Sequence, residues 1–210
     1  MYFLLIFFGL TQQCFIEAAN NVSKVEIKKD FNIVKTNINR ERSINKLFKY
    51  SWENNDIDSR IIAISYVESR LNVNIHSGDK GKACGTFQIH ARYSYPMFRR
   101  KRGFVNWKEK ENKIKIKSEC KKLKRVKYSV KTMKKLLYMM DKRDLHPCHH
   151  NSGFYGKCNT WYKQRIDFIY NYLETSKVLC KNNSKLISVE IAAKIYKAKF
   201  KLLKFFKSLF

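Results

Sequence analysis

One stretch, residues 61–88, constrains the fold of this chain more than any other. It reads IIAISYVESRLNVNIHSGDKGKACGTFQ, an apolar helical pattern followed by a turn-forming segment. Apolar residues recur at the start of this stretch and just before it at the spacing that forms one stripe on a helix, namely Ile57, Ile61 and Ile64. Asp56 and Ser59 are typical N-cap residues for such a helix, and the asparagines and glycines of residues 72–85 predict that it ends and the chain turns back.

Glu68 follows Ile64 by four positions, so we expect its carboxyl group on the buried stripe near the end of this helix. Burial without a counter-charge disfavours the ionised form of a carboxyl group, so such a group holds a proton near neutral pH and acts as a general acid. The structural alternative is that Glu68 pairs with Arg70 or extends to water. The first interpretation predicts a catalytic residue, and the second a surface ion pair.

Three short motifs follow one another along the chain. The first is Glu68-Ser69, followed by Ser77-Gly78; the second is Gly85-Thr86-Phe87-Gln88; and the third is His150-Asn151-Ser152-Gly153. In this order they resemble the motifs of the soluble lytic transglycosylase (SLT) family. The resemblance covers roughly residues 55–175, and motifs in the right order with helical patterns between them are more specific than any one alone. It implies a mainly α, lysozyme-like helical domain with a short irregular or β-hairpin-like turn region after the catalytic helix.

The resemblance also implies an activity, which is cleavage of the β-1,4 bond between MurNAc and GlcNAc in peptidoglycan with a 1,6-anhydro product. Glu68 would act first as the general acid and then as the base, without a cofactor or a metal. Substrate contacts would come from the residues of the later motifs and of Glu68-Ser69, namely Ser69, Gln88, His150, Asn151 and Gly153. A hydrolytic lysozyme (muramidase) is the alternative. It would ordinarily use a second carboxylate, for which Asp79 is the candidate, although Asp79 is also a typical turn residue.

The chain departs from the family pattern at the position before Asn151. His150 stands where the family has a tyrosine that helps to position the catalytic carboxyl group. His150, Tyr155 or Tyr93 would replace it, and the tyrosines are also candidates for binding the sugar. A protonated His150 would favour the ionised form of Glu68, which opposes the acid role.

A zinc site is a further possibility near the third motif. The suitable ligand types there are His146, Cys148, His149, His150 and Cys158. Their spacing matches no common zinc pattern, so we expect no metal. In an exported protein the cysteines are candidates for disulfides, whose pairing does not follow from the sequence.

The net charge of +27 predicts binding to a polyanion. Lys and Arg are densest in residues 99–127, where we expect a solvated face or a positive rim. For an enzyme that acts as a monomer on peptidoglycan, this charge would hold the chain on the anionic wall, and nucleic acid is not an expected partner. The competing hypothesis is a non-enzymatic cationic protein that binds a membrane or nucleic acid.

The sequence divides into four segments. Residues 1–19 have an apolar core typical of a secretory signal peptide or hydrophobic leader, or alternatively of a short buried helix. Residues 20–44 resemble a basic lead-in or linker, and residues 45–178 would form the domain. We therefore expect an exported phage or bacterial protein, periplasmic, extracellular or virion-associated, that acts at the cell wall.

The last segment, residues 179–210, predicts a basic amphipathic helix. One apolar stripe consists of Ile191, Ile195, Ala198, Leu202, Phe206 and Leu209. A second stripe consists of Lys194, Lys197, Lys201 and Lys204. Such a helix is a candidate for lying on an anionic membrane, and the alternative is a terminal helix that docks on the domain.

Overall fold

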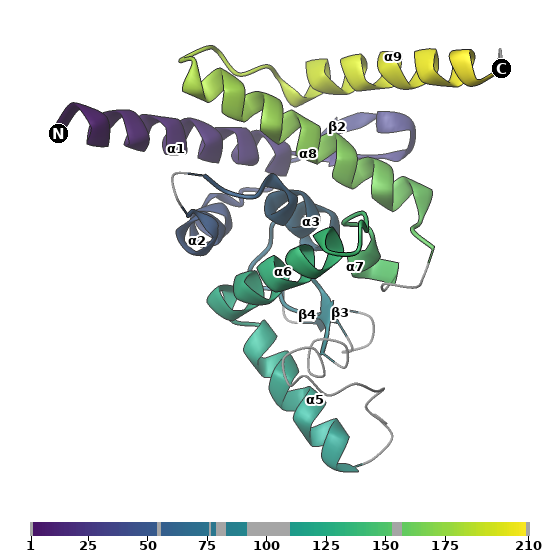
Figure 1. The fold of residues 1–210 in the computed structure, drawn as a ribbon. Helices are drawn as coiled ribbons and strands as arrows, with labels where there is room; N and C mark the ends of the chain where they lie inside the picture. Colours follow the sequence, from purple (N-terminus) through teal and green to yellow (C-terminus); the bar gives the residue numbers. More distant parts are fainter. Residues whose placement is uncertain are drawn as a thin grey trace.

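The computed structural model describes residues 2–53, 56–75, 77–78, 83–91, 110–152 and 157–208 (Figure 1). Helices make up most of this part of the chain, and its strands are short and antiparallel. The predicted mainly α class is therefore confirmed. None of the described helices combines the length and the apolar character that crossing a bilayer requires.

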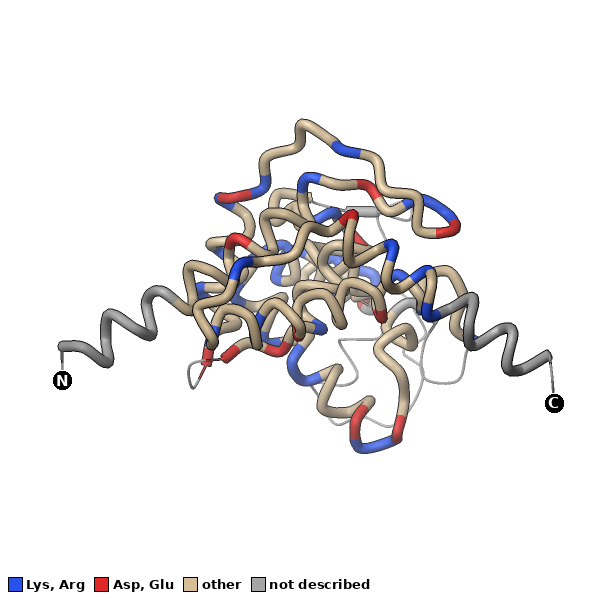
Figure 2. The backbone as a smooth tube through the Cα atoms, turned by 90° about the horizontal axis from the view of Figure 1, so that it is seen from above, with Lys and Arg blue, Asp and Glu red and all other residues tan. Residues whose placement is uncertain are grey.

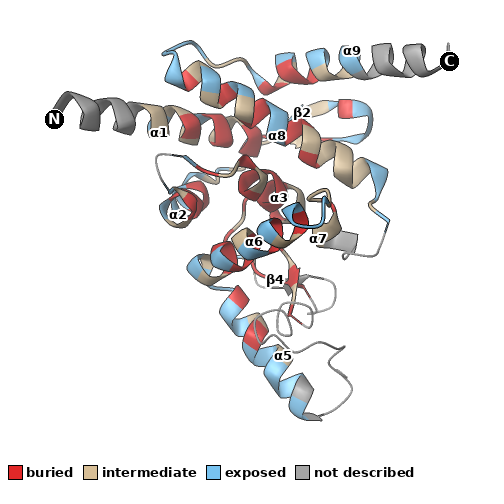
Figure 3. Ribbon diagram, viewed as in Figure 1, coloured by how far each residue is buried: buried red, intermediate tan, exposed pale blue. Residues whose placement is uncertain are grey.

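The N-terminal helix α1 (Tyr2–Ser23) contributes to the core with its second half. Its buried residues are Phe15, Ala18, Ala19 and Val22 (Figure 3). A hairpin follows, with β1 (Val25–Ile27), a 3-10 turn η1 (Lys29–Phe31) and β2 (Ile33–Lys35), and then α2 (Glu41–Ser51). Residues 20–44, expected to be a lead-in, thus form ordered elements with apolar side chains in the core.

The central helix α3 (Ser59–Ser69) is the predicted helix, but all residues from 61 to 66 are buried, so it is covered on every side and not along one stripe. It packs against α8, α1 and α6. Its N-cap is Asp58, whose side chain accepts a hydrogen bond from the Arg60 amide, and not Asp56 or Ser59. The Asp56 carboxylate instead pairs with Lys177 at 2.9 Å, while Ser59 is already the first helical residue.

The helix ends without a glycine. Arg70 and Leu71 adopt left-handed backbone conformations, with φ of 53° and 60°. Tertiary contacts compensate for these conformations, because Leu71 is fully buried and Arg70 pairs with Glu26 at 3.7 Å. The chain therefore turns at Arg70 and Leu71, before the asparagines and glycines at which the sequence predicted the turn.

A small antiparallel sheet follows in the order β3 (Ser77–Gly78), β4 (Ala83–Cys84) and β5 (Ile89–His90). The turn between β4 and β5 consists of residues 85–88, the second motif. Helix α5 (Lys110–Leu123) is joined to β4 by the Cys84–Cys120 disulfide. The described lysines and arginines of residues 113–127 are exposed, in agreement with the expected solvated face.

Three further helices complete the domain: α6 (Val126–Asp141), α7 (His149–Ser152) and α8 (Thr160–Lys181). Apolar residues recur at helical spacing over residues 130–140, and they form the buried face of α6, namely Val130, Met133, Leu136, Leu137 and Met140. Helix α8 packs against both α3 and α1, and the Cys14–Cys180 disulfide joins it to α1. The Cys148–Cys158 disulfide joins the start of α7 to the segment before α8.

The last helix, α9 (Val189–Ser208), begins after a link over residues 182–188, so the boundary at residue 179 falls inside α8. Its first half docks on the domain through Tyr196, whose ring contacts Phe31 and Phe168. The docked alternative therefore holds for this half. Figure 2 shows Lys and Arg spread over the described chain and not gathered on one element.

Candidate active site

Glu68 lies in the last turn of α3, and its side chain is 10% exposed. The hydroxyl of Tyr162, in the first turn of α8, donates a hydrogen bond to Glu68 Oε1. Arg70, the partner named in the structural alternative, pairs with Glu26 instead. The tight packing of α3 against α8 therefore fixes the position of a nearly buried carboxyl group.

Tyr162 remains a proton donor in this arrangement. Burial, and then the negative charge of Glu68, raise the pKa of Tyr162 well above its ordinary value. The positive charge of Arg165 acts in the opposite direction and does not outweigh them. At neutral pH the phenol is therefore protonated, and Glu68 Oε1 accepts its hydrogen.

His150 approaches the same carboxyl group from α7. Its side chain is 3% exposed, and Nε2 lies 3.9 Å from Glu68 Oε1. The same nitrogen donates a hydrogen bond to the Phe87 carbonyl oxygen. A carbonyl oxygen only accepts, so Nε2 carries a proton, and the neutral tautomer of the ring meets this requirement. The hydrogen bond therefore does not require the charged His150 that would oppose an acid role.

The second motif is held on α3 by a buried network of hydroxyl groups. Thr86 Oγ1 lies 2.8 Å from Ser65 Oγ and 3.1 Å from Ser69 Oγ. Ser69 also donates a hydrogen bond to the Ser65 carbonyl oxygen at 2.9 Å. Ser69 and Ser65 of α3 thus hold the turn in place, and Thr86 is the residue of the turn that contacts them.

Gln88 closes the turn on itself. Its Nε2 donates to the Gly85 carbonyl oxygen at 2.7 Å, and its backbone is left-handed with φ of 48°. Gly85 has φ of 72°, and a Cβ there would lie 2.1 Å from the Leu123 carbonyl oxygen. This position therefore accepts only glycine, because of both the backbone conformation and the close approach of α5.

The structure thus brings Glu68 and His150 together, and it places Ser69 at the end of α3 against the supporting turn and Gln88 within that turn. Asn151 follows His150 in α7, where only its backbone is described. Four predicted site residues lie outside the described residues, namely Asp79, Tyr93, Gly153 and Tyr155. Tyr162 was missed, because its spacing within α8 gives no signal that its hydroxyl reaches a residue 94 positions away.

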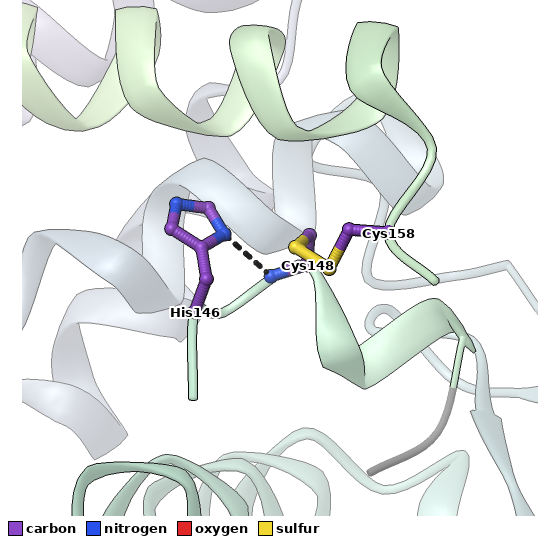
Figure 4. Close-up of side chains that lie close together, drawn as sticks. All are labelled: His146, Cys148 and Cys158. Carbon is purple, nitrogen blue, oxygen red and sulfur yellow. Dashed lines mark hydrogen bonds between the residues drawn. A yellow bond between two sulfur atoms is a disulfide. The ribbon is translucent and has the colours of Figure 1, made fainter. Parts of the chain in front are cut away.

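One group of potential metal ligands comes together in the described part of the chain, namely His146, Cys148 and Cys158 (Figure 4). The two sulfur atoms form a disulfide, so neither is a thiolate ligand. His146 Nδ1 accepts a hydrogen bond from the Cys148 amide at 3.0 Å, which leaves Nε2 to donate to Asp167 at 2.6 Å. Both ring nitrogens of His146 are therefore used within the protein.

Comparisons with protein-family models, with curated proteins and with solved structures find no match to this chain. The resemblance to the transglycosylase family therefore depends on the motif residues themselves and on the positions that they occupy around Glu68.

Proposed function

We propose that the chain is a peptidoglycan lytic transglycosylase with a lysozyme-like domain, in which Glu68 is both acid and base. The observation that carries the proposal is the environment of Glu68. This carboxyl group is nearly buried at the end of α3, next to the turn of the second motif and the helix of the third. The meeting of these motifs at one carboxyl group is what an acid and base role of Glu68 requires.

In the first step, protonated Glu68 donates its proton to the glycosidic oxygen as the bond from that oxygen to C1 of MurNAc breaks. Positive charge develops on the sugar ring, and the carboxylate left on Glu68 is negative. The Tyr162 hydroxyl then provides a hydrogen bond to this carboxylate, which stabilises the negative form.

In the second step, the C6 hydroxyl oxygen of the same sugar forms a bond to C1 and gives its proton to Glu68. The products are a 1,6-anhydro end and a free GlcNAc hydroxyl, and the enzyme returns to its starting protonation state. This scheme uses one carboxyl group and consumes no water. The hydrolytic alternative needs a second carboxylate to hold or activate water, and its candidate, Asp79, lies outside the described residues.

Mass spectrometry of the fragments released from purified peptidoglycan tests the proposal. We expect fragments with 1,6-anhydro ends, lighter by one water than the hydrolysis products. We expect Glu68→Gln to lower the cleavage rate by about 100- to 10,000-fold, the range for loss of a general acid–base group. Reducing ends that depend on Glu68 would instead support the muramidase alternative.

The matched control is Glu174→Gln, on the flank of α8 that faces the start of α3. Glu174 accepts a hydrogen bond from Ser59 and is remote in sequence from the motif residues. Binding to sedimented peptidoglycan is measured in parallel, because the net charge of +27 alone supports adhesion. Wall binding without any fragment that depends on Glu68 would reject the enzyme and favour the cationic binder.

A further inference from the structure

Helix α9 has two apolar lines, and the domain covers only one of them. The covered line is Val189, Ala192, Ala193 and Tyr196, of which the first three are buried and the last packs on aromatic rings. On the other side Ile191 is 51% exposed and Ile195 is 59% exposed. The docked helix therefore presents two large aliphatic side chains, one turn apart, to the surroundings.

The sequence continues both lines beyond residue 199. Phe200 and Leu203 follow Tyr196 by four and seven positions, at the spacing of the covered line. Leu202 and Phe206 continue the spacing of Ile191 and Ile195. Two apolar lines on one helix are more than docking on the domain requires, so the outer line needs a separate physical explanation.

Lysines flank the outer line. Lys194 and Lys199 are exposed, and they lie on opposite sides of Ile195 at helical spacing. Over its whole length α9 carries six lysines and a single acidic residue, Glu190. A narrow apolar line with positive charge on both sides is complementary to a layer in which anionic groups cover an apolar interior.

We propose that the outer line of α9, begun by Ile191 and Ile195, binds the surface of an anionic lipid bilayer. The helix lies parallel to the surface, the isoleucine side chains enter the boundary between headgroups and acyl chains, and the lysines contact lipid phosphates. The long lysine stems allow the charged amino groups to remain in the headgroup layer while the backbone lies deeper.

Other occupants fit the same face less well. A second copy of the chain would bring Lys194 and Lys199 of both copies together in a protein that already carries a charge of +27. A nucleic acid would satisfy the lysines with phosphate but would leave the exposed isoleucines in contact with water. Only a layer that is anionic outside and apolar within satisfies both parts of the face.

Co-sedimentation of the full chain with phosphatidylcholine vesicles, with and without phosphatidylglycerol, tests the proposal. We expect binding only to the vesicles that contain phosphatidylglycerol. The double substitution Ile191→Ser with Ile195→Ser is expected to weaken that binding at least about tenfold through lost apolar burial. Lys194→Gln with Lys199→Gln should weaken it as well, most clearly at low salt.

The matched control is Val178→Ser, an exposed aliphatic residue of α8 with 58% exposure, which should bind vesicles as the parent chain does. Thermal melting followed by circular dichroism verifies that each variant is folded. Parental binding by the Ile191 and Ile195 double variant, or equal binding to neutral vesicles, would overturn the proposal. The proposal would also be overturned if the chain did not bind vesicles and instead formed a dimer, seen by sedimentation velocity, that the same double substitution disrupts.

Discussion

The hydroxyl of Tyr162 donates a hydrogen bond to Oε1 of Glu68, and so links the first turn of α8 to the last turn of α3. The pairing gives the carboxyl group a fixed neighbour that is present before any substrate arrives. Under the proposed function, Tyr162 would position the carboxyl group, as the tyrosine next to the third-motif asparagine does in the resembled family. In this chain His150 occupies that neighbouring position, and its Nε2 bonds to the Phe87 carbonyl oxygen of the turn and lies 3.9 Å from Glu68 Oε1.

Removal of the Tyr162 hydroxyl by Tyr162→Phe should lower the rate of peptidoglycan cleavage about 10- to 100-fold, as expected for loss of one hydrogen bond to a charged group. The fragments should keep their anhydro ends, because the substitution leaves Glu68 in place. The rate of release of soluble fragments measures the effect. Tyr138→Phe, at a ring that is 61% exposed on α6, is the control, and an equal rate for the two variants would contradict the prediction.

Substitution of Gly85 by alanine should destabilise the protein by about 2 to 4 kcal/mol, from a strained positive φ and an overpacked contact together. The added methyl group would meet the Leu123 carbonyl oxygen at 2.1 Å. Urea unfolding followed by tryptophan fluorescence measures the change. Lys121→Ala, at an exposed position of α5, should change the unfolding free energy by less than about 0.5 kcal/mol. A comparable loss of unfolding free energy in both variants would show that position 85 does not require glycine.

Loss of the Cys14–Cys180 disulfide should lower the free energy of unfolding by about 3 to 5 kcal/mol, because this disulfide closes a loop with a sequence separation of 166. Loss of the Cys148–Cys158 disulfide, with a separation of 10, should cost less on the same grounds. Guanidinium unfolding of Cys14→Ser with Cys180→Ser and of Cys148→Ser with Cys158→Ser, without reductant, gives both values. The reverse order of the two costs would contradict this loop-entropy argument.

Asp167 should make stability depend on pH in the acid range. Burial tends to raise the pKa of Asp167, but hydrogen bonds from His146 and Lys163 outweigh it and hold the pKa below its ordinary value. A lowered folded pKa means that ionised Asp167 stabilises the fold above the ordinary carboxyl value of about 4. This contribution is lost as the pH falls through the lowered pKa.

We therefore expect Asp167→Asn to reduce the free energy of unfolding by about 1 kcal/mol at neutral pH, as for one net hydrogen bond. The difference from the parent should shrink toward zero at pH values below the lowered pKa. Thermal melts over a series of pH values measure it, with Glu111→Gln, at a side chain that is 86% exposed, as the control. A gap between parent and Asp167→Asn that widens on acidification would reverse the sign of the argument.

The sequence predicts those parts of the fold in which one apolar spacing decides an element. The isoleucines of α3 and the Met and Leu positions of α6 are of this kind, and the nearly buried position of Glu68 agrees with the first. Spacing within one helix reports which residues share a face. The spacing does not report which distant element covers that face. It therefore predicted neither the Tyr162 contact nor the disulfide pairing.

Two local expectations failed for a related reason. Asp56, Asp58 and Ser59 are equally good N-cap residues by type, but Asp58 caps α3. The backbone of Asp58 is extended, as an N-cap requires, and the Asp56 carboxylate is paired with Lys177. Arg70 takes a left-handed conformation that normally favours glycine, and its contacts with the β1 strand offset the strain. In both cases tertiary partners outweigh local preference.

The packing of α1 on α8 also has a consequence for the order in which the chain acquires its structure during synthesis. The apolar side chains of residues 15–22 leave the ribosome long before residues 160–181, against which the helix packs. Until that late segment emerges, this apolar face has no native partner and is open to non-native contacts. Correct folding therefore depends on keeping the first helix from premature association while about three quarters of the chain is still being made.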